Sequence, residues 1–230
     1  MLWQKVIGAV ARRLQFVGGV GLSSASTQTP SFSLTGLSGG LAASPAPGDI
    51  VIVAVSFKDN TDRNIQCTTS GYTEVADLYY NAATNDSQLG VYYKVLSLAE
   101  TSVAFNLGVN VASFLACHVW RNINATPLDA TTTTTESRSP PNPASITTTT
   151  DNAVVIAIGG GAAGGGTIGT ITAPTGMENL FSASSSSVAG IGIASILIAS
   201  PQTYDPAAFG GFSASTSDGA CSATLALRAA

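Results

Sequence analysis

Charge is what this 230-residue chain has least of, since Asp, Glu, Lys and Arg together make up only 10% of its residues. Ordinary soluble domains carry about 25%, so most of the polar surface must come from Ser, Thr, Asn and Gly. Such a surface suits a protein held in an assembly, because a free monomer relies on charge for its solubility. We therefore expect a homo-oligomer or a component of a larger particle.

Basic residues are especially scarce. There are nine Lys and Arg, the net charge is −4, and the one tight basic group lies in the first thirteen residues. Because a surface that follows phosphates needs many cations, we expect no nucleic-acid partner. No apolar run approaches the ~18 residues of a membrane span, and the first residues do not have the charge order of a signal peptide.

Cysteine and histidine are also few. Cys67, Cys117 and Cys221 have no zinc-pair spacing, so we expect buried free thiols that act as small apolar side chains. A His-based triad would have to use His118, the single histidine. Adjacent strand residues point to opposite faces, which separates Cys117 from His118. We expect a structural or surface His118, no metal site and no cofactor.

The acidic residues are scattered. The loop Asp59-Asn60-Thr61-Asp62 has oxygens that suit Ca²⁺, but it lacks the EF-hand spacing with its terminal Glu. No two carboxylates stand out as the pair that glycoside hydrolysis needs. We therefore predict that the protein is not an enzyme, and a glycan-active enzyme is the remote alternative.

A repeated order of segments is what the chain does have. The matched pairs are residues 49–55 and 152–158, 71–76 and 176–181, 90–95 and 192–197, and 119–121 and 226–228. The offsets of 103, 105, 102 and 107 residues barely drift, and the order is kept. Such self-similarity indicates a repeated structural unit. The sequence predicts two similar sheet-forming halves.

The apolar patterns are those of strands. Residues 50–57 and 112–120 are buried-strand runs, residues 103–107 alternate, and Pro45 and Pro47 mark a turn. Many short strands between turns are typical of sandwiches and jelly rolls. We predict an all-β fold, a β-sandwich or jelly-roll-like domain with two pseudo-repeated halves, preceded by a short N-terminal amphipathic helix.

A stretch rich in Thr and Pro joins the two halves. Threonine favours extended backbone and proline prevents a helix, so we interpret residues 131–150 as an extended strap, with a disordered linker as the alternative. The predicted segments are an anchor over 1–15, a first β half over 16–130, the strap over 131–150 and a second β half over 151–230. Residues 16–230 are expected to form one compact domain.

Apolar residues recur at helical spacing before the first strand. The amphipathic anchor docks on a partner, packs on its own domain or lies on a membrane surface. We expect no membrane partner, which leaves the first two. The residues proposed for partner docking are Leu2, Trp3, Val6, Ile7, Val10, Arg12 and Arg13.

One glycine motif superficially indicates a dinucleotide site. Residues 159–164 match G-x-G-x-x-G after the strand at residues 154–158. The fingerprint also needs a helix whose N-terminus faces the pyrophosphate. More Gly and β-branched residues follow instead, and these are poor helix formers. We expect a flexible or tightly packed Gly-rich loop and no bound nucleotide.

Tyrosines cluster in the first half. Tyr79-Tyr80 and Tyr92-Tyr93 each place one ring on either face of a strand. Exposed rings of this kind would form a patch for a glycan or a protein partner, whereas buried ones would pack across neighbouring strands. All four are candidate surface-binding aromatics.

Several short motifs are similar to those of one group of proteins. They lie at residues 33–37, 47–53, 71–74, 89–94, 204–211 and 223–228. Together they resemble a loosely defined group of β-rich virion proteins of tailed bacteriophages and prophages, over about residues 16–229. The resemblance carries over no catalytic residue.

This resemblance implies a virion protein that is assembled in the host cytoplasm and whose partners are other virion proteins. We expect a capsid decoration or cement protein bound to the major capsid protein. The alternative is a tail, neck or fibre component that contacts the host surface, where it binds a glycan.

Overall fold

The computed structural model describes residues 12–82, 84–164, 167–212, 215 and 217–230. Every regular element among these residues is a β-strand, which confirms the all-β prediction. No helix in this part of the chain is long and apolar enough to cross a membrane. The predicted N-terminal helix lies mainly outside the described residues. Its last residues, 12–14, are irregular rather than helical, and Leu14 is buried in the core.

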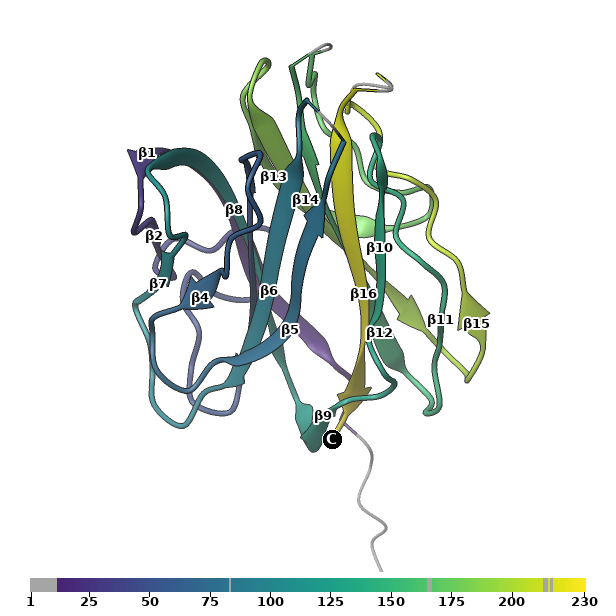
Figure 1. Ribbon diagram of the computed structural model, residues 1–230. Coiled ribbons are helices and arrows are strands. Elements are labelled where there is room, and N and C mark those ends of the chain that lie inside the picture. Colours follow the sequence, from purple (N-terminus) through teal and green to yellow (C-terminus); the bar gives the residue numbers. More distant parts are fainter. Residues whose placement is uncertain (1–11, 83, 165–166, 213–214, 216) are drawn as a thin grey trace, which may run out of the picture.

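Two antiparallel sheets form the body of the protein (Figure 1). In order across the first sheet, the strands are β1 (Gln15–Thr27), β8 (Val111–Arg121), β3 (Ile50–Lys58), β6 (Ser87–Val95) and β5 (Thr73–Tyr80). Across the second they are β10 (Thr133–Arg138), β16 (Gly219–Ala229), β12 (Ala153–Ala162), β14 (Ala189–Ile198) and β13 (Glu178–Ser184), and β9 (Ile123–Leu128) also pairs with β16. Two small sheets are made by β2 (Ser31–Ser33), β7 (Ser102–Asn106) and β4 (Gln66–Cys67), and by β11 (Ile146–Thr147) and β15 (Thr203–Tyr204).

The two large sheets share one strand order and one register. The edge ladders β5–β6 and β13–β14 even have their irregularity at matching places, after Glu74 and after Glu178. Three residue pairs of the first sheet each match a pair of the second. Ile50–Trp120 matches Val154–Leu227, Ile50–Val95 matches Val154–Leu197, and Thr73–Tyr93 matches Glu178–Ser195. These pairs give offsets of 104 for β3 and β12, 107 for β8 and β16, 102 for β6 and β14, and 105 for β5 and β13. The offset of 103 that the sequence suggested for the first strand is one residue short.

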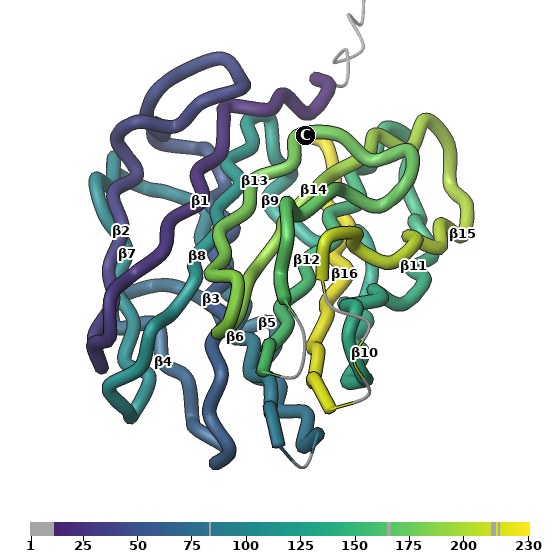
Figure 2. The backbone as a smooth tube through the Cα atoms, turned by 90° about the horizontal axis from the view of Figure 1, so that it is seen from above, coloured from purple at the N-terminus to yellow at the C-terminus, as the bar shows by residue number. Residues whose placement is uncertain are grey.

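The main core lies between the two large sheets, which pack face to face. Figure 2 shows the N-terminal half on one side and the C-terminal half on the other. Alternate residues of each sheet point inward, among them Ile52 and Leu89 of the first sheet and Ile156 and Ile193 of the second. Because strand side chains alternate between faces, each sheet has a second, outward face that must also be covered.

Two further layers cover these outward faces. Over the first sheet, Phe32 and Phe105 from the β2–β7–β4 sheet pack on Val53 and its neighbours. Over the second, Ile171 and Phe209 from long loops pack on Ala157 and its neighbours. The central strands are therefore buried on both faces, which explains why they have continuous apolar runs instead of alternating ones.

The glycine run belongs to β12, so the prediction of a Gly-rich loop was wrong. Residues 159–161 are fully buried strand positions. An added Cβ would lie 2.7 Å from a Phe209 ring atom at Gly159 and 2.4 Å from Ser56 Oγ at Gly160. The missing side chains thus let other segments approach the strand closely, as glycine does within strands.

The Thr/Pro-rich stretch is extended and takes part in the second sheet. Its first Thr run forms β10, which pairs with β16 from Thr133 to Arg138. β9, at the end of the expected first half, also joins the second sheet. Threonine favours such pleated positions. The sequence therefore changes sheets near Asn122, which has a φ of 66°.

The outer edges of the two sheets lie against each other. A Cβ on Gly21 of β1 would be 2.3 Å from the carbonyl oxygen of Ser182 in β13, so this glycine permits the close approach of β1 and β13. Ser182 lies within β13. Covering an edge in this way protects it from pairing with other chains.

Candidate functional site

One end of the molecule, here called the terminal end, collects the surface features of interest. β3 and β12 begin there, β8 and β16 finish there, and Arg12 lies beside Ala230. Three of the most exposed large apolar side chains, Leu41, Val95 and Leu98, also lie at this end. Exposed apolar side chains that gather in one region mark interaction surfaces.

Two buried carboxylates fix the loops of the terminal end. Asp49 accepts hydrogen bonds from Arg121 Nε at 2.7 Å and Nη2 at 2.9 Å, and this pairing raises the pKa of Arg121. Bidentate pairs of this kind hold both partners in a defined geometry.

In the second sheet, Asp129 accepts hydrogen bonds from Thr149, Thr150 and Arg228. Burial raises the pKa of Asp129, but the hydrogen bonds from Thr150 and Thr149 outweigh burial and hold that pKa below its ordinary value. Arg121 and Arg228 occupy matching places at the ends of β8 and β16, so both halves anchor this end with an ion pair.

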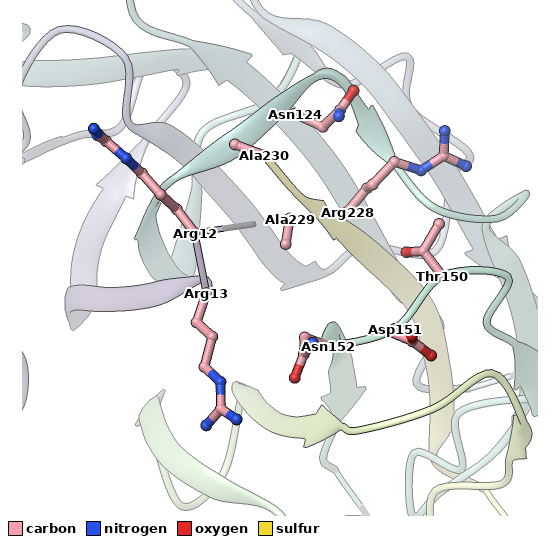
Figure 3. A pocket seen from close by; sticks show the side chains of 9 residues that line it. All are labelled: Arg12, Arg13, Asn124, Thr150, Asp151, Asn152, Arg228, Ala229 and Ala230. Atoms are coloured by element: carbon pink, nitrogen blue, oxygen red, sulfur yellow. The ribbon is translucent and has the colours of Figure 1, made fainter. Parts of the chain in front are cut away.

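The pocket in Figure 3 has a volume of about 330 Å³ and lies between the start of the described chain and β16. Arg12 and Arg13 extend in opposite directions, and Arg228 points away from both. Since the three guanidinium groups do not converge, they do not form one anion site. Arg12 and Arg13 are exposed and remain accessible to a partner.

A second pocket, also about 330 Å³, opens between the two sheets on the flank formed by β8, β13 and β14. It is called here the Trp120 pocket. Trp120, which is 6% exposed, lines this pocket, and its ring centroid lies 5.0 Å from that of Phe16. The other lining residues are Gly176, Glu178, Asn179, Ser195, Ile196 and Leu197.

Asn179 has a strained backbone in this wall. Its φ of 54° lies in the left-handed region, which side-chain-bearing residues rarely occupy. It sits at the irregularity between Glu178 and Phe181, where the ladder to β14 shifts register. Bulges and strained residues of this kind concentrate at functional sites, where they redirect a side chain.

Both sheets hold Asn179 in place. Nε2 of His118, in the first sheet, donates to the Asn179 carbonyl at 2.8 Å, and Asn179 Nδ2 donates to Ser195 Oγ at 3.0 Å. Burial lowers the pKa of His118 to about 3, so the ring is neutral. His118 thus has a structural position, packed against Phe16 and Phe181.

The four tyrosines do not form one surface patch. Tyr92 is buried, which corrects its proposed role as a surface aromatic, and its hydroxyl donates to the Ile65 carbonyl at 2.5 Å. Tyr79, Tyr80 and Tyr93 are half-buried. Tyr93 pairs at the opposite end of the β5–β6 ladder from Tyr79 and Tyr80. The hydroxyl of Tyr79 donates to Asp86, and this hydrogen bond raises the Tyr79 pKa to about 12.

The thiols and the acidic loop have ordinary structural environments. Cys117 and Cys221 are buried, and burial raises the pKa of Cys67 to about 11, so these thiols are protonated. Asp59 pairs with Arg63 at 2.5 Å instead of leaving its carboxylate open. Within the described ranges, no group of three or more His, Cys, Asp and Glu side chains is placed to hold a metal ion.

Comparisons with known proteins establish no family. No family model matches the chain, and no curated protein matches it. Among solved structures, oxalate decarboxylase from Bacillus subtilis aligns with 95% of this chain and 77% of its own, with 9% identity and a TM-score of 0.18. A TM-score this low does not establish a shared fold, so the alignment has no bearing on function.

Sequence reasoning missed the polar side of the Trp120 pocket. Glu178, Asn179 and Ser195 become neighbours of Trp120 only when the two sheets pack together. The repeat contained one signal of this pocket. Ser195 stands where the first half has the much larger Tyr93, 102 positions earlier. A small residue in place of a large one leaves space unless another side chain fills it.

Proposed function

We propose that this protein is a structural component of a tailed-bacteriophage virion, most directly a capsid decoration or cement protein that stabilises the head through subunit contacts. The observation that carries the proposal is the set of exposed apolar side chains at the terminal end. Exposed Leu41, Val95 and Leu98 lie at the end where the described chain starts, at residue 12 of the proposed anchor over residues 1–15. Scarce charge and the resemblance to phage virion proteins support the same assignment.

We further propose that the fold is a β-sandwich, jelly-roll-like in its many antiparallel strands, made of a duplicated unit. The shared strand order and register of the two large sheets support this interpretation. A body with buried central strands and covered edges is rigid, which suits a protein that must resist deformation in a particle. In this proposal the protein adds interface area between neighbouring subunits.

The N-terminal segment is the proposed attachment to the major capsid protein or to a neighbouring copy. Its apolar side chains, with Arg12 and Arg13, dock on the partner as an amphipathic helix does in a groove.

Removal of the segment tests the proposal. The deletion should cover residues 1–11 and spare Leu14, which is part of the core. We expect the shortened protein to fold with an unchanged circular dichroism spectrum but to be absent from purified particles. A finer test compares Trp3→Ser/Val6→Ser with the matched polar change Gln4→Ser, and only the former should reduce incorporation. Normal loading of the deletion variant would contradict the anchor.

The second candidate is a tail, neck or fibre component that contacts a glycan on the host surface. The Trp120 pocket favours it, because this pocket combines an aromatic ring with three polar side chains. A glycan-active enzyme would need a second carboxylate beside Glu178. Among the described residues that line this pocket, Glu178 is the single carboxylate.

A further inference from the structure

We infer that the Trp120 pocket is a binding site for a single neutral sugar ring. The inference deepens the second candidate function, contact with a host-surface glycan, and names the site that makes this contact. It rests on the difference between the two halves, on the geometry of Asn179, and on the chemistry of the lining.

The two halves differ at the place where the pocket forms. In the first half, the inward-facing position of β6 that pairs with Thr73 holds Tyr93, which packs against the main core. The matching residue of β14 is Ser195, which is 1% exposed. A duplicated sheet would accept a large side chain at both places, but only the first has one. Tyr93 fills the space at its position in the first half. At the matching position in the second half, the smaller Ser195 leaves an opening beside Trp120.

The polar groups around this opening are held in position before any ligand arrives. Asn179 is tied to His118 of the first sheet and to Ser195 of the second, so its amide moves little. Its backbone has a φ of 54°, a conformation uncommon outside glycine, so the surrounding contacts hold Asn179 in a defined position. Preorganised hydrogen-bonding groups reduce the entropy that is lost on binding.

The lining offers hydrogen-bond acceptors next to apolar surface. Glu178 is exposed, so its carboxylate is accessible to a ligand. Ser195 and Asn179 add a hydroxyl and an amide, while Trp120 and the 48%-exposed Leu197 add apolar area. A sugar ring has hydroxyl donors around its rim and apolar C–H faces, and it therefore matches both features.

Size and charge narrow the ligand class. A volume of about 330 Å³ lies at the low end of small-molecule sites, which suits one ring rather than an extended chain. A quaternary ammonium group would use Trp120 and Glu178, but it carries no donor for the Ser195 hydroxyl or the Asn179 amide. A neutral sugar uses all four side chains.

Tryptophan fluorescence tests the inference directly. The chain has two tryptophans, Trp3 and Trp120, so Trp3→Phe in the full-length protein leaves Trp120 as the sole reporter. This protein is titrated with D-glucose, D-galactose, D-mannose and N-acetyl-D-glucosamine, and with choline chloride as the cationic probe. We expect a saturable change in emission with at least one sugar at millimolar concentration and none with choline.

Variants in the same Trp3→Phe background assign the binding to the pocket. Ser195→Tyr introduces the residue found at the matching place in the first half and should weaken sugar binding at least about tenfold, or 1.4 kcal/mol. Asn179→Gly removes the amide and suits the left-handed backbone, so it tests the site even if the tyrosine variant does not fold. Leu22→Ser changes an exposed residue of β1 outside the pocket and should bind as the parent does.

Three results would overturn the inference. They are the absence of a saturable response to every sugar, saturation by choline alone, and unchanged sugar affinity in Asn179→Gly. Because the titration uses the isolated protein, its failure leaves the virion assignment standing, and absence of the protein from virions would not erase a measured sugar affinity.

Discussion

Gly160 lies where β12 of the second sheet closely approaches β3 of the first, and Gly160→Ala tests whether the sheets pack as described. An ideal Cβ at this position would lie 2.4 Å from Ser56 Oγ and 2.7 Å from Ser56 Cβ. Rotation of the serine side chain can move Oγ, but it cannot move Cβ. β3 and β12 must therefore separate locally to accept the added methyl group.

The clash should outweigh the usual benefit of alanine. Replacing a strand glycine by alanine gains about 0.5–1 kcal/mol where space permits, whereas overpacking a close-packed core costs about 1–3 kcal/mol. We expect a net loss of about 1–2 kcal/mol, which would lower Tm by about 2–8 °C in a protein of this length.

Urea denaturation followed by circular dichroism measures the effect, with two companion variants. Gly160→Ala/Ser56→Gly removes the clashing atoms and should recover most of the loss, because no described group forms a hydrogen bond with Ser56 Oγ. Gly169→Ala is the matched control, since its nearest neighbour is 3.8 Å away, and it should change stability by less than about 0.5 kcal/mol. Parental stability of Gly160→Ala would refute the face-to-face packing at this point.

Three further predictions concern titratable side chains. Burial lowers the pKa of His118 from 6.5 to about 3. Between pH 6.5 and pH 3 the imidazole is protonated only in the unfolded state, so the stability of the folded protein should fall as the pH decreases through this range. Relative to His118→Gln, the parent should lose about 1.4 kcal/mol per pH unit below pH 6.5 in urea titrations, and parallel pH profiles would contradict this. Burial raises the pKa of Asp77 from 3.8 to about 6, so its contribution is lost as pH rises through 6, and Asp77→Asn should gain stability over the parent at pH 8 but not at pH 4. Arg121→Met leaves the carboxylate of Asp49 without its main partner and should lower the free energy of unfolding by about 2–3 kcal/mol. This is less than the ~3–5 kcal/mol of a fully buried pair, because the Arg121 side chain is 36% exposed. Equal urea midpoints for the variant and the parent would disprove this.

Local patterns in the sequence were sufficient to predict several of the strands. The run at residues 50–57 is nearly the whole of β3, and the alternation at residues 103–107 covers all but the first residue of β7. The glycine run of β12 was misread because glycine ordinarily weakens strands. The glycine run is buried by Phe209 and Phe212, which lie some fifty residues later in the chain. A local sequence pattern does not reveal such long-range contacts.

The candidate site was harder to predict from the sequence, for the same reason. Tyr92 and Tyr93 are neighbours in sequence, yet one packs under the outer layer and the other in the main core, and only sheet pairing decides this. Trp120, Asn179 and Ser195 come from three strands and meet through tertiary packing. The comparison of Ser195 with Tyr93 becomes informative once the register of both halves is known.

The most direct test of the proposed function is the amount of this chain in purified virions. Gel densitometry against the major capsid protein gives the number of copies per particle. A decoration protein predicts a copy number comparable with that of the major capsid protein. Far fewer copies would favour the tail, neck or fibre alternative, and absence from the particle would contradict the virion assignment.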